Sequence, residues 1–368
     1  MDIDKDFSRN IWCLLGLPFD AVNMNQAAIE ILSAANERRR CFLSTPNLNF
    51  LCGTQTDAAF RESVINSELS VVDGFPIVLT AKLLGIPLPE RVAGSNLVEF
   101  LYSRNTDVPL KVFFFGGEPG VAEKASRAVN ENPSGLVSVG QYTPGFGSVE
   151  NMSTPEIIDT INRNDVELLI VAVSAKKGQA WIELNRHQLK APVISHLGAV
   201  INFFAGTVKR APVSVQNMGL EWLWRIYQEP SLWKRYYDDG LRFLKLLACN
   251  VFPYWLQLKF KPLPSDDQPV AIQTAITPEN RYQIAISGNC TYRTIAPLRT
   301  EYKKAVLDNR DVVIDLQHVQ TIDSAFLGLS LILYKHLKTS GHSVKFINFN
   351  KNIRRIIKWQ KVDDLFTS

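Results

Sequence analysis

The stretch Leu110-Lys111-Val112-Phe113-Phe114-Phe115-Gly116-Gly117 defines the fold of the larger part of this chain. It is apolar except for one lysine, it ends at a glycine pair, and the helical pattern Val121–Asn130 follows it. A short and almost uniformly apolar run predicts a strand that is buried on both faces, as in the parallel sheets whose strands alternate with helices. Residues 110–130 therefore predict one strand–helix unit of such a sheet.

The same rhythm occurs on both sides of this unit. Short apolar runs alternate with helical patterns at Ile11–Leu17, Asn25–Arg39, Cys41–Leu43, Glu167–Val173, Trp181–Gln188 and Pro192–His196. We therefore expect residues 1–205 to form an α/β core with a mostly parallel, Rossmann-like sheet and helices on both faces. Ligands of such sheets bind at the carboxyl ends of the strands.

Two short motifs fall at expected strand ends. In Val71-Val72-Asp73-Gly74 an aspartate ends an apolar run, where a rigid element would present its carboxylate to a cleft. Asp-Gly is also a common turn. Gly116-Gly117 could lend backbone N–H groups to a phosphate, or it could serve as a plain strand-to-helix turn. The residues alone leave both pairs of interpretations open.

Length and cysteine content limit the class of protein. A chain of 368 residues exceeds what one core usually spans, so we expect more than one domain. The five cysteines are widely spaced without a Cys-x-x-Cys pair, which favours neither a disulfide framework nor a zinc site and fits a reducing cytoplasm. The acidic N-terminus does not resemble a signal peptide, and no apolar stretch is long enough to span a bilayer.

Charge is distributed unevenly along the chain. The net charge is +4, but acids outnumber bases in residues 1–205 and bases predominate in residues 206–261. The latter segment holds Trp222, Trp224, Trp233 and Trp255, and its Ser231–Asn250 part has the pattern of an amphipathic helix. Such a basic, aromatic appendage suits an anionic membrane surface, or its apolar face could pack on the sheet.

A short linker separates a small C-terminal domain. Residues 262–269 are polar and proline-rich, as linkers are, and residues 270–368 have the pattern of a separate small α/β domain. The basic residues of this domain are interleaved with acidic ones, and the domain has no recognisable motif that reads the grooves of a nucleic acid. We therefore expect no nucleic-acid partner.

Several motifs in residues 11–250 resemble those of the WecG/TagA/CpsF glycosyltransferases, which add a sugar from a nucleotide diphosphate to a polyprenyl-diphosphate-linked acceptor. The matching words, in order, are Thr45-Pro46-Asn47, Val72-Asp73-Gly74, Glu90-Arg91-Val92-Ala93-Gly94-Ser95, Phe115-Gly116-Gly117-Glu118-Pro119-Gly120, Gly206-Thr207-Val208-Lys209-Arg210-Ala211-Pro212 and Gly219-Leu220-Glu221-Trp222-Leu223-Trp224-Arg225. The resemblance implies that Asp73 is the catalytic base and that Thr45, Asn47 and Arg91 belong to the substrate site.

The implied chemistry agrees with these residue types. Inverting glycosyl transfer needs one carboxylate to take the proton of the acceptor hydroxyl. A nucleoside diphosphate leaves without protonation if cations neutralise it, and arginine suits this task. Arg91 is the first candidate, and Arg210 and Arg225 are further ones. We expect a UDP-sugar donor and no required cofactor or metal, since the family works without an Asp-x-Asp clamp.

One word departs from the family pattern. Lys176-Lys177-Gly178-Gln179 stands where the family has Pro-Lys-Gln-Glu, and Gln179 is the candidate that would replace the displaced glutamine. This departure motivates an alternative: a catalytically impaired regulatory or scaffold protein that acts through its C-terminal domain.

Residues from about 270 to 366 resemble a STAS domain through Val312-Val313-Ile314-Asp315-Leu316 and Thr321-Ile322-Asp323-Ser324-Ala325-Phe326-Leu327-Gly328-Leu329. The resemblance implies a protein partner and points to Ser324 as a phosphorylation site, although Asp323 and Ser324 could simply cap a helix. Together the two resemblances imply an enzyme of exopolysaccharide or cell-wall polymer synthesis, located in the cytoplasm at the inner face of the membrane.

Overall fold

The computed structural model describes residues 2–263 and 269–367, which form two compact units. The central unit comprises Val22–Val78 and Pro89–Leu241, and the terminal unit comprises Met1–Ala21, Leu79–Leu88 and Arg242–Ser368. The chain up to Ala21 thus groups with the C-terminal part, whereas we expected it in the 1–205 core. Residues 264–268 of the expected linker lie outside the described residues.

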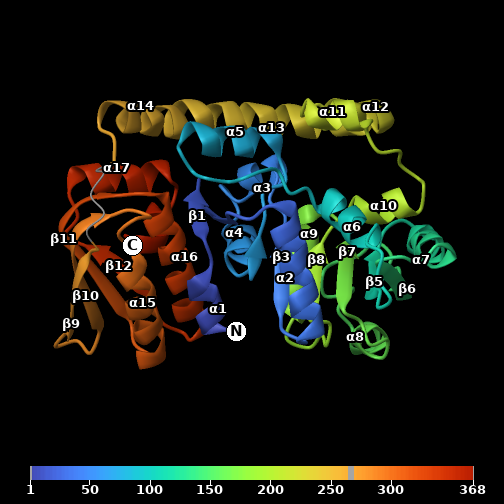
Figure 1. Ribbon diagram of the computed structural model, residues 1–368, viewed down its shortest axis with the longest axis horizontal. Coiled ribbons are helices and arrows are strands. Elements are labelled where there is room, and N and C mark those ends of the chain that lie inside the picture. Colours follow the sequence, from blue (N-terminus) through green and yellow to red (C-terminus); the bar gives the residue numbers. More distant parts are fainter. Residues whose placement is uncertain (1, 264–268, 368) are drawn as a thin grey trace. The chain divides into compact units, whose positions relative to one another are not determined.

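The central unit holds a six-stranded sheet in which all neighbouring strands are parallel. Its strands are β3 (Cys41–Ser44), β4 (Leu69–Ser70), β5 (Leu110–Gly116), β6 (Leu136–Tyr142), β7 (Leu168–Ala172) and β8 (Val193–His196). Their order in the sheet is β4-β3-β8-β7-β5-β6. Figure 1 labels β3, β8, β7, β5 and β6 from left to right in this order. The expected parallel sheet is confirmed. Every residue of the inner strand β7 is buried, as its apolar sequence predicts.

Ten α-helices of the described residues lie wholly within the central unit. They are α2 (Met24–Asn36), α3 (Leu48–Gly53), α4 (Ala58–Ile65), α6 (Gly94–Tyr102), α7 (Val121–Glu131), α8 (Pro155–Asn162), α9 (Ala175–Asn185), α10 (Val200–Phe204), α11 (Val213–Asn217) and α12 (Glu221–Gln228). The division between the units falls inside two further helices, α5 (Phe75–Leu83) and α13 (Trp233–Leu246).

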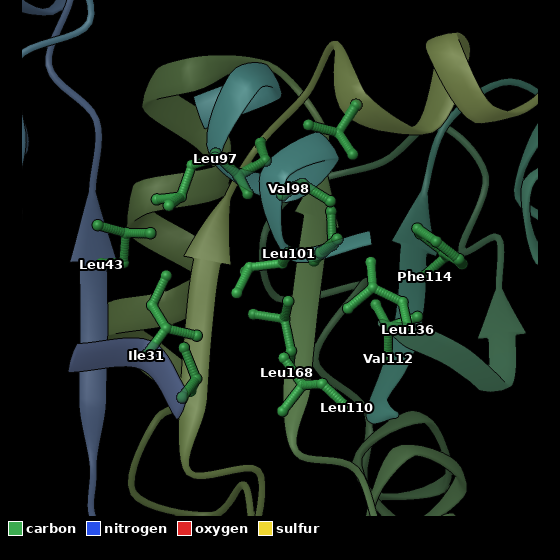
Figure 2. Close-up of a cluster of buried hydrophobic side chains, with 14 of the residues drawn as sticks. Ile31, Leu43, Leu97, Val98, Leu101, Leu110, Val112, Phe114, Leu136 and Leu168 are labelled. Atoms are coloured by element: carbon green, nitrogen blue, oxygen red, sulfur yellow. The ribbon is translucent and has the colours of Figure 1, made fainter. Parts of the chain in front are cut away.

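Strand β5 builds both cores of this sheet, because its side chains alternate between the two faces. Val112 and Phe114 join one buried cluster, which Figure 2 shows together with Ile31 of α2 and Leu97 and Leu101 of α6. Phe113 and Phe115 join the other cluster, with residues of α8 and α9. Each fully buried side chain of this size contributes about 1.5–3 kcal/mol. The uniformly apolar run is therefore explained by helices on both faces.

The glycine pair after β5 is required by a close approach of two backbones. Gly116 has φ +103°, and a Cβ atom there would lie 2.5 Å from the carbonyl oxygen of Ala172. Gly117 donates its N–H to the same oxygen at 2.8 Å. Any side chain at position 116 would clash with strand β7, so the pair makes the strand-to-helix turn possible.

The terminal unit contains a four-stranded sheet with the order β12-β11-β10-β9. Its strands are β9 (Ala271–Ile276), β10 (Tyr282–Cys290), β11 (Val312–Ile322) and β12 (Val344–Ile347), and its helices include α14 (Phe252–Phe260), α15 (Ala296–Asp308), α16 (Ser324–Thr339), α17 (Lys351–Trp359) and α18 (Asp363–Phe366). Only β9 is antiparallel to its neighbour. The expected small C-terminal α/β fold is confirmed.

The expected strand at Ile11–Leu17 is not part of the parallel sheet. The chain instead forms an antiparallel hairpin of β1 (Ile11–Leu14) and β2 (Leu17–Asp20) within the terminal unit. Leu15 and Gly16 both have positive φ, 51° and 87°, and reverse the chain in two residues. The apolar run predicted burial correctly, but it did not reveal which partner buries it.

The hairpin and the short helix α1 (Ile3–Ser8) pack against helix α16. The carboxylate of Asp6 accepts a hydrogen bond from Lys335 Nζ and contacts His336 Nε2, each at 2.9 Å, and all three side chains are buried. Burial alone would raise the pKa of Asp6, but Lys335, His336 and Arg9 hold it well below its usual range. A Cβ at Gly328 of α16 would lie 2.7 Å from the carbonyl oxygen of Ile11, so this glycine admits the hairpin.

Candidate active site

A cavity of about 570 Å³ lies in the central unit. It is lined by the segments that follow β3, β4, β7 and β8 at the carboxyl ends of these parallel strands, and by residues of α12 and α13. Its polar and charged lining includes Thr45, Asn47, Asn49, Asp73, Arg91, Ser95, Ser174, His196, Glu221, Arg225, Arg235, Tyr236 and Asp239. This is the sheet edge at which ligands of such folds bind.

Asp73 is fixed by the backbone on both sides of it. Its N–H donates to the carbonyl oxygen of Pro46 at 3.0 Å, and the N–H of Val92 donates to the carbonyl oxygen of Val72 at 2.9 Å. At Gly74 the chain turns, and the N–H of Ile77 donates to its carbonyl oxygen at 3.1 Å. A Cβ at Gly74 would lie 3.7 Å from Cα of Asn47. The carboxylate is therefore held at the cavity by rigid elements.

The surroundings of Asp73 change its acidity. Its side chain is 27% exposed, and burial raises its pKa to about 6 against the opposing effects of Arg91 and the Gly94 N–H. The N–H of Gly94 donates to Oδ2 at 3.4 Å, and Arg91 Nε lies 3.9 Å from Oδ1. The nearby Glu221 raises the pKa further. A carboxyl with this pKa changes its protonation state near neutrality, as a general base should.

Arg91 lies between two carboxylates. Besides Asp73 it contacts Glu221 of α12, to which its Nη2 donates a hydrogen bond. Arg225, one turn further along α12, also lines the cavity. Its buried Nε has no hydrogen-bond partner in the part of the chain that the structure describes. A guanidinium with an unused buried donor is suited to an anionic ligand.

Thr45 and Asn47 also lie at the cavity, so the structure brings them together with Asp73, Arg91 and Arg225. Thr45 is buried, and its side chain lies 3.4 Å from the position of a Cβ on Gly94. Asn47 is the N-cap of α3, where its Oδ1 accepts a hydrogen bond from the Phe50 N–H at 3.2 Å. This cap orients the amide group at the cavity.

Four other candidate residues do not line this cavity among the described residues. Gln179 is fully buried in α9 and donates to Ser44 Oγ at 3.3 Å. Arg210 donates to Glu99 and Asn96. Gly116 and Gly117 form the tight turn against β7 described above. The structure thus accounts for the glycine pair by packing.

Ser324 is buried in the terminal unit. Gln360 Nε2 donates to its Oγ at 3.1 Å, and Gln360 Oε1 accepts from the Leu15 N–H at 2.9 Å. Asp323 caps α16 by accepting from the N–H groups of Ala325 and Phe326 at 2.9 and 3.0 Å. The capping interpretation is therefore confirmed for Asp323. A kinase cannot reach Ser324 in this conformation.

Several cavity residues were missed from the sequence. Glu221 belongs to one of the motifs that resemble the family, and Asn49 lies two residues after Asn47. Nothing in the sequence gave a chemical reason to choose either of them. His196 ends β8. Its Nε2 lies 2.8 Å from the carbonyl oxygen of Val173 and donates to it, while burial lowers the pKa of this imidazole. Nothing in the sequence marked Asp239 as a site residue, because it lies in a helix whose charged residues are mostly basic.

Two kinds of feature are absent from the described residues. Within 2–263 and 269–367, no group of three or more His, Cys, Asp and Glu side chains is arranged to hold a metal ion. No helix in those ranges has the length and apolar character needed to cross a bilayer.

Comparisons with known proteins agree with this architecture. The model of the "Glycosyl transferase WecG/TagA/CpsF family" matches residues 12–256, and that of "Mlab, STAS domain" matches residues 274–367. An N-acetylglucosaminyldiphosphoundecaprenol N-acetyl-beta-D-mannosaminyltransferase of Bacillus spizizenii is 26% identical over 201 residues, 54% of this chain and 76% of that protein. The enzyme of the same name from Staphylococcus aureus strain MW2 is 25% identical over 224 residues, 60% and 85% of the two chains.

Solved structures also match part of the chain. The phosphorylated form of the Bacillus cell fate determinant SpoIIAA aligns with 26% of this chain and 89% of its own, at 14% identity and a TM-score of 0.23. The family model, which spans more than half of the residues, carries the assignment. The chain therefore belongs to the WecG/TagA/CpsF family of glycosyltransferases and has a STAS domain at its C-terminal end.

Proposed function

We propose that this enzyme transfers a sugar from a nucleoside diphosphate, namely a UDP-sugar, to a polyprenyl-diphosphate-linked glycan with inversion at the anomeric carbon. The observation that carries the proposal is the carboxylate of Asp73, with a pKa of about 6, beside Arg91 in a cavity of sufficient size for a nucleotide sugar. The reaction belongs to the assembly of an exopolysaccharide or cell-wall polymer.

The proposed step uses Asp73 as the base. The acceptor hydroxyl gives its proton to the carboxylate while its oxygen forms a bond to the anomeric carbon on the face opposite the leaving group. The bond from that carbon to the diphosphate oxygen breaks, and its electron pair leaves with the nucleoside diphosphate. Attack from the opposite face inverts the configuration. No second carboxylate is needed, because the diphosphate leaves as an anion.

The cations of the cavity support departure of the diphosphate. Arg91 and Arg225 line the cavity, and bidentate hydrogen bonds from guanidinium groups to phosphate oxygens stabilise the charge that develops there. Arg210 pairs with Glu99 and does not line the cavity, so in this proposal it does not contact the diphosphate directly. Thr45 and Asn47 add neutral hydrogen-bonding groups that position the substrates.

The names of the relatives supply the substrate class. They describe enzymes that act on N-acetylglucosaminyl-diphospho-undecaprenol and transfer N-acetylmannosamine. We take a polyprenyl diphosphate that carries N-acetylglucosamine as the first acceptor to test. The chain covers 76% and 85% of these relatives, but the identity is low, so the donated sugar must be found by experiment.

A membrane-bound acceptor requires the enzyme to reach the bilayer surface. Helix α13 carries exposed apolar side chains at helical spacing, namely Trp233, Tyr237, Leu241 and Leu244. Lys234, Arg242 and Lys245 are exposed on α13. An exposed apolar stripe that includes aromatic residues and is flanked by cations is suited to the interface of an anionic membrane. We assign this helical face to peripheral contact with the inner face of the cytoplasmic membrane.

The STAS domain is proposed to bind a protein partner. Since Ser324 is buried beneath Gln360, such binding would not depend on a phosphoserine at this position. The alternative to catalysis is a scaffold that has lost turnover and works through this domain.

One experiment separates the two functions. UDP-sugars are screened against a short-chain polyprenyl diphosphate bearing N-acetylglucosamine, products are read by mass, and binding of UDP is measured by calorimetry. A product heavier by one sugar with each turnover supports the transferase. Absence of both UDP binding and product, with and without the acceptor, would favour the scaffold.

A further inference from the structure

Helix α13 presents a polar edge to the cavity. Arg235, Tyr236, Asp239 and Gly240 all line it, and residues four apart lie on the same face of a helix. The exposed apolar side chains of this helix, such as Tyr237 and Leu241, point to a different side of the helix. One helix thus combines a cavity wall with the surface that we assigned to the membrane.

Asp239 is a buried carboxylate that has no cationic partner in the part of the chain that the structure describes. Its residue is 6% exposed, and its Oδ2 accepts a hydrogen bond from Asn49 Nδ2 at 3.0 Å. Its backbone carbonyl oxygen accepts from Cys52 Sγ at 3.4 Å. Among the described residues no lysine, arginine or histidine forms an ion pair with it. Buried carboxylates are usually paired, and an ionised carboxylate accepts about four hydrogen bonds. Asp239 therefore retains acceptor capacity toward a ligand in the cavity.

The walls beside Asp239 suit a sugar ring. Phe50, Phe75, Trp222 and Tyr236 line the same cavity, and the rings of Trp222 and Tyr236 lie 6.3 Å apart between centroids. A Cβ on Gly240 would meet no atom within 4 Å, so space remains open next to the carboxylate. A pyranose offers an apolar C–H face to an aromatic ring and hydroxyl donors to a carboxylate. This arrangement fits both parts of that chemistry.

The charges in the cavity decide which part of the substrates binds beside Asp239. A carboxylate repels a diphosphate, whereas Arg91 and Arg225 attract it. Arg235, one turn before Asp239, is exposed and its guanidinium lies over the ring of Tyr236 rather than against Asp239. The neutral sugar therefore belongs at Asp239. Asn49 follows the N-cap Asn47 by two residues in α3, and Asn47 lies against Gly74 beside the catalytic carboxylate. A sugar held at Asn49 and Asp239 is therefore near Asp73.

We infer that Asp239, braced by Asn49, binds the hydroxyl groups of the acceptor's terminal sugar. The acceptor is favoured over the donor because the same helix carries the face assigned to the membrane, from which the lipid-linked substrate arrives. The inference rests on the proposed function. It adds a specificity-determining contact that distinguishes a glycosylated polyprenyl diphosphate from a bare one.

The test compares binding of two lipids by calorimetry: a short-chain polyprenyl diphosphate with N-acetylglucosamine and the same lipid without it. The full-length protein should bind the glycosylated lipid more tightly. Asp239→Asn and Asn49→Ala should each weaken that binding about ten- to a hundredfold and leave binding of the bare lipid and of UDP unchanged, because only the contacts with the sugar are lost. Asp238→Asn, at the exposed neighbouring carboxylate, is the matched control and should bind both lipids normally.

The outcomes separate this inference from the proposed function. A preference for the glycosylated lipid that persists in both variants would overturn it, as would an absence of preference in the unmodified protein. Weakened binding of UDP and of both lipids, with a lower melting temperature, would show that Asp239 only fastens α13 to α3. If Asp239→Asn does not fold, Asn49→Ala decides. Sugar transfer is not needed for any of these readouts, so a failure of the catalytic proposal would appear separately in the mass assay.

Discussion

Arg91 Nε lies 3.9 Å from Oδ1 of Asp73. The guanidinium opposes the rise in the pKa of Asp73 that burial causes, but it does not cancel this rise. The guanidinium is shared with Glu221, to which it donates through Nη2. Asp73 is therefore less acidic than an ordinary aspartate, although a cation lies beside it. This balance makes the carboxylate a better proton acceptor than an aspartate in a strong ion pair would be.

The pH dependence of transfer should report this balance. Because the pKa of Asp73 is raised to about 6, kcat/KM should fall about tenfold per pH unit below pH 6 and level off above it. Glu221→Gln removes a negative charge that raises this pKa, so the acid limb should shift to lower pH. Initial rates between pH 4.5 and 8 measure both profiles. A limb that stays in place in the variant would exclude Glu221 from tuning Asp73.

The buried carboxylate of Asp73 should lower the free energy of unfolding at neutral pH. A carboxyl whose pKa is higher in the folded than in the unfolded state binds protons more readily when folded. Its contribution therefore becomes unfavourable as pH rises from the unfolded value of 3.8 through about 6. Asp73→Asn should raise the free energy of unfolding at pH 7.5 by about 1–3 kcal/mol and have little effect at pH 4. Urea unfolding at the two pH values measures the difference; equal effects at both would contradict the raised pKa.

The helical face of α13 should hold the protein on anionic membranes. Arg242→Glu combined with Lys245→Glu should release it from vesicles that contain phosphatidylglycerol, because each basic residue near such a surface contributes about 1 kcal/mol. Lys124→Glu with Lys190→Glu, at exposed positions elsewhere, carries the same change of charge and should remain bound. Vesicle flotation at moderate salt provides the measurement. Equal flotation of the two double variants would leave α13 without a membrane role.

Ser324 should behave as a packing residue. Ser324→Ala removes one hydrogen bond from Gln360 and should cost about 0.5–1.5 kcal/mol, whereas Ser324→Glu must bury a charge beside Asp323 and should cost several kcal/mol. Thermal melts of both variants compare them. A glutamate variant as stable as the unmodified protein would mean that the site opens easily and would restore phosphorylation as a role for Ser324.

Local patterns predicted the parallel sheet and the small C-terminal domain, because each strand and helix there is specified by its own periodicity. The run Leu110–Phe115 had to be buried on both faces, and β5 is. The run Ile11–Leu17 was equally apolar, but its turn at Leu15 and Gly16 and its partner helix α16 depend on contacts with residues more than 300 positions away. Such distant pairing leaves no periodic signal.

The cavity followed the same rule. Thr45, Asn47 and Asp73 come shortly after β3 and β4, at the sheet edge where ligands of such folds bind. Arg91 follows no strand directly, and only the family resemblance pointed to it. Gln179 was chosen by its place in an altered word, yet helix α9 turns it into the core against Ser44. Asp239 was missed because its burial depends on how α13 packs against α3, through Asn49 and Cys52, which a helical pattern does not specify.

The central claim is that Asp73 takes the proton of the acceptor hydroxyl. The most direct measurement is the single-turnover rate of sugar transfer by Asp73→Asn, with the UDP-sugar and glycosylated lipid that the screen identifies, together with the dissociation constant of UDP for the same variant. We expect the rate to fall by about 10²–10⁴-fold while UDP binding and folding are retained. A rate within a few-fold of the unmodified enzyme, at unchanged UDP affinity, would contradict the assignment of Asp73 as the base.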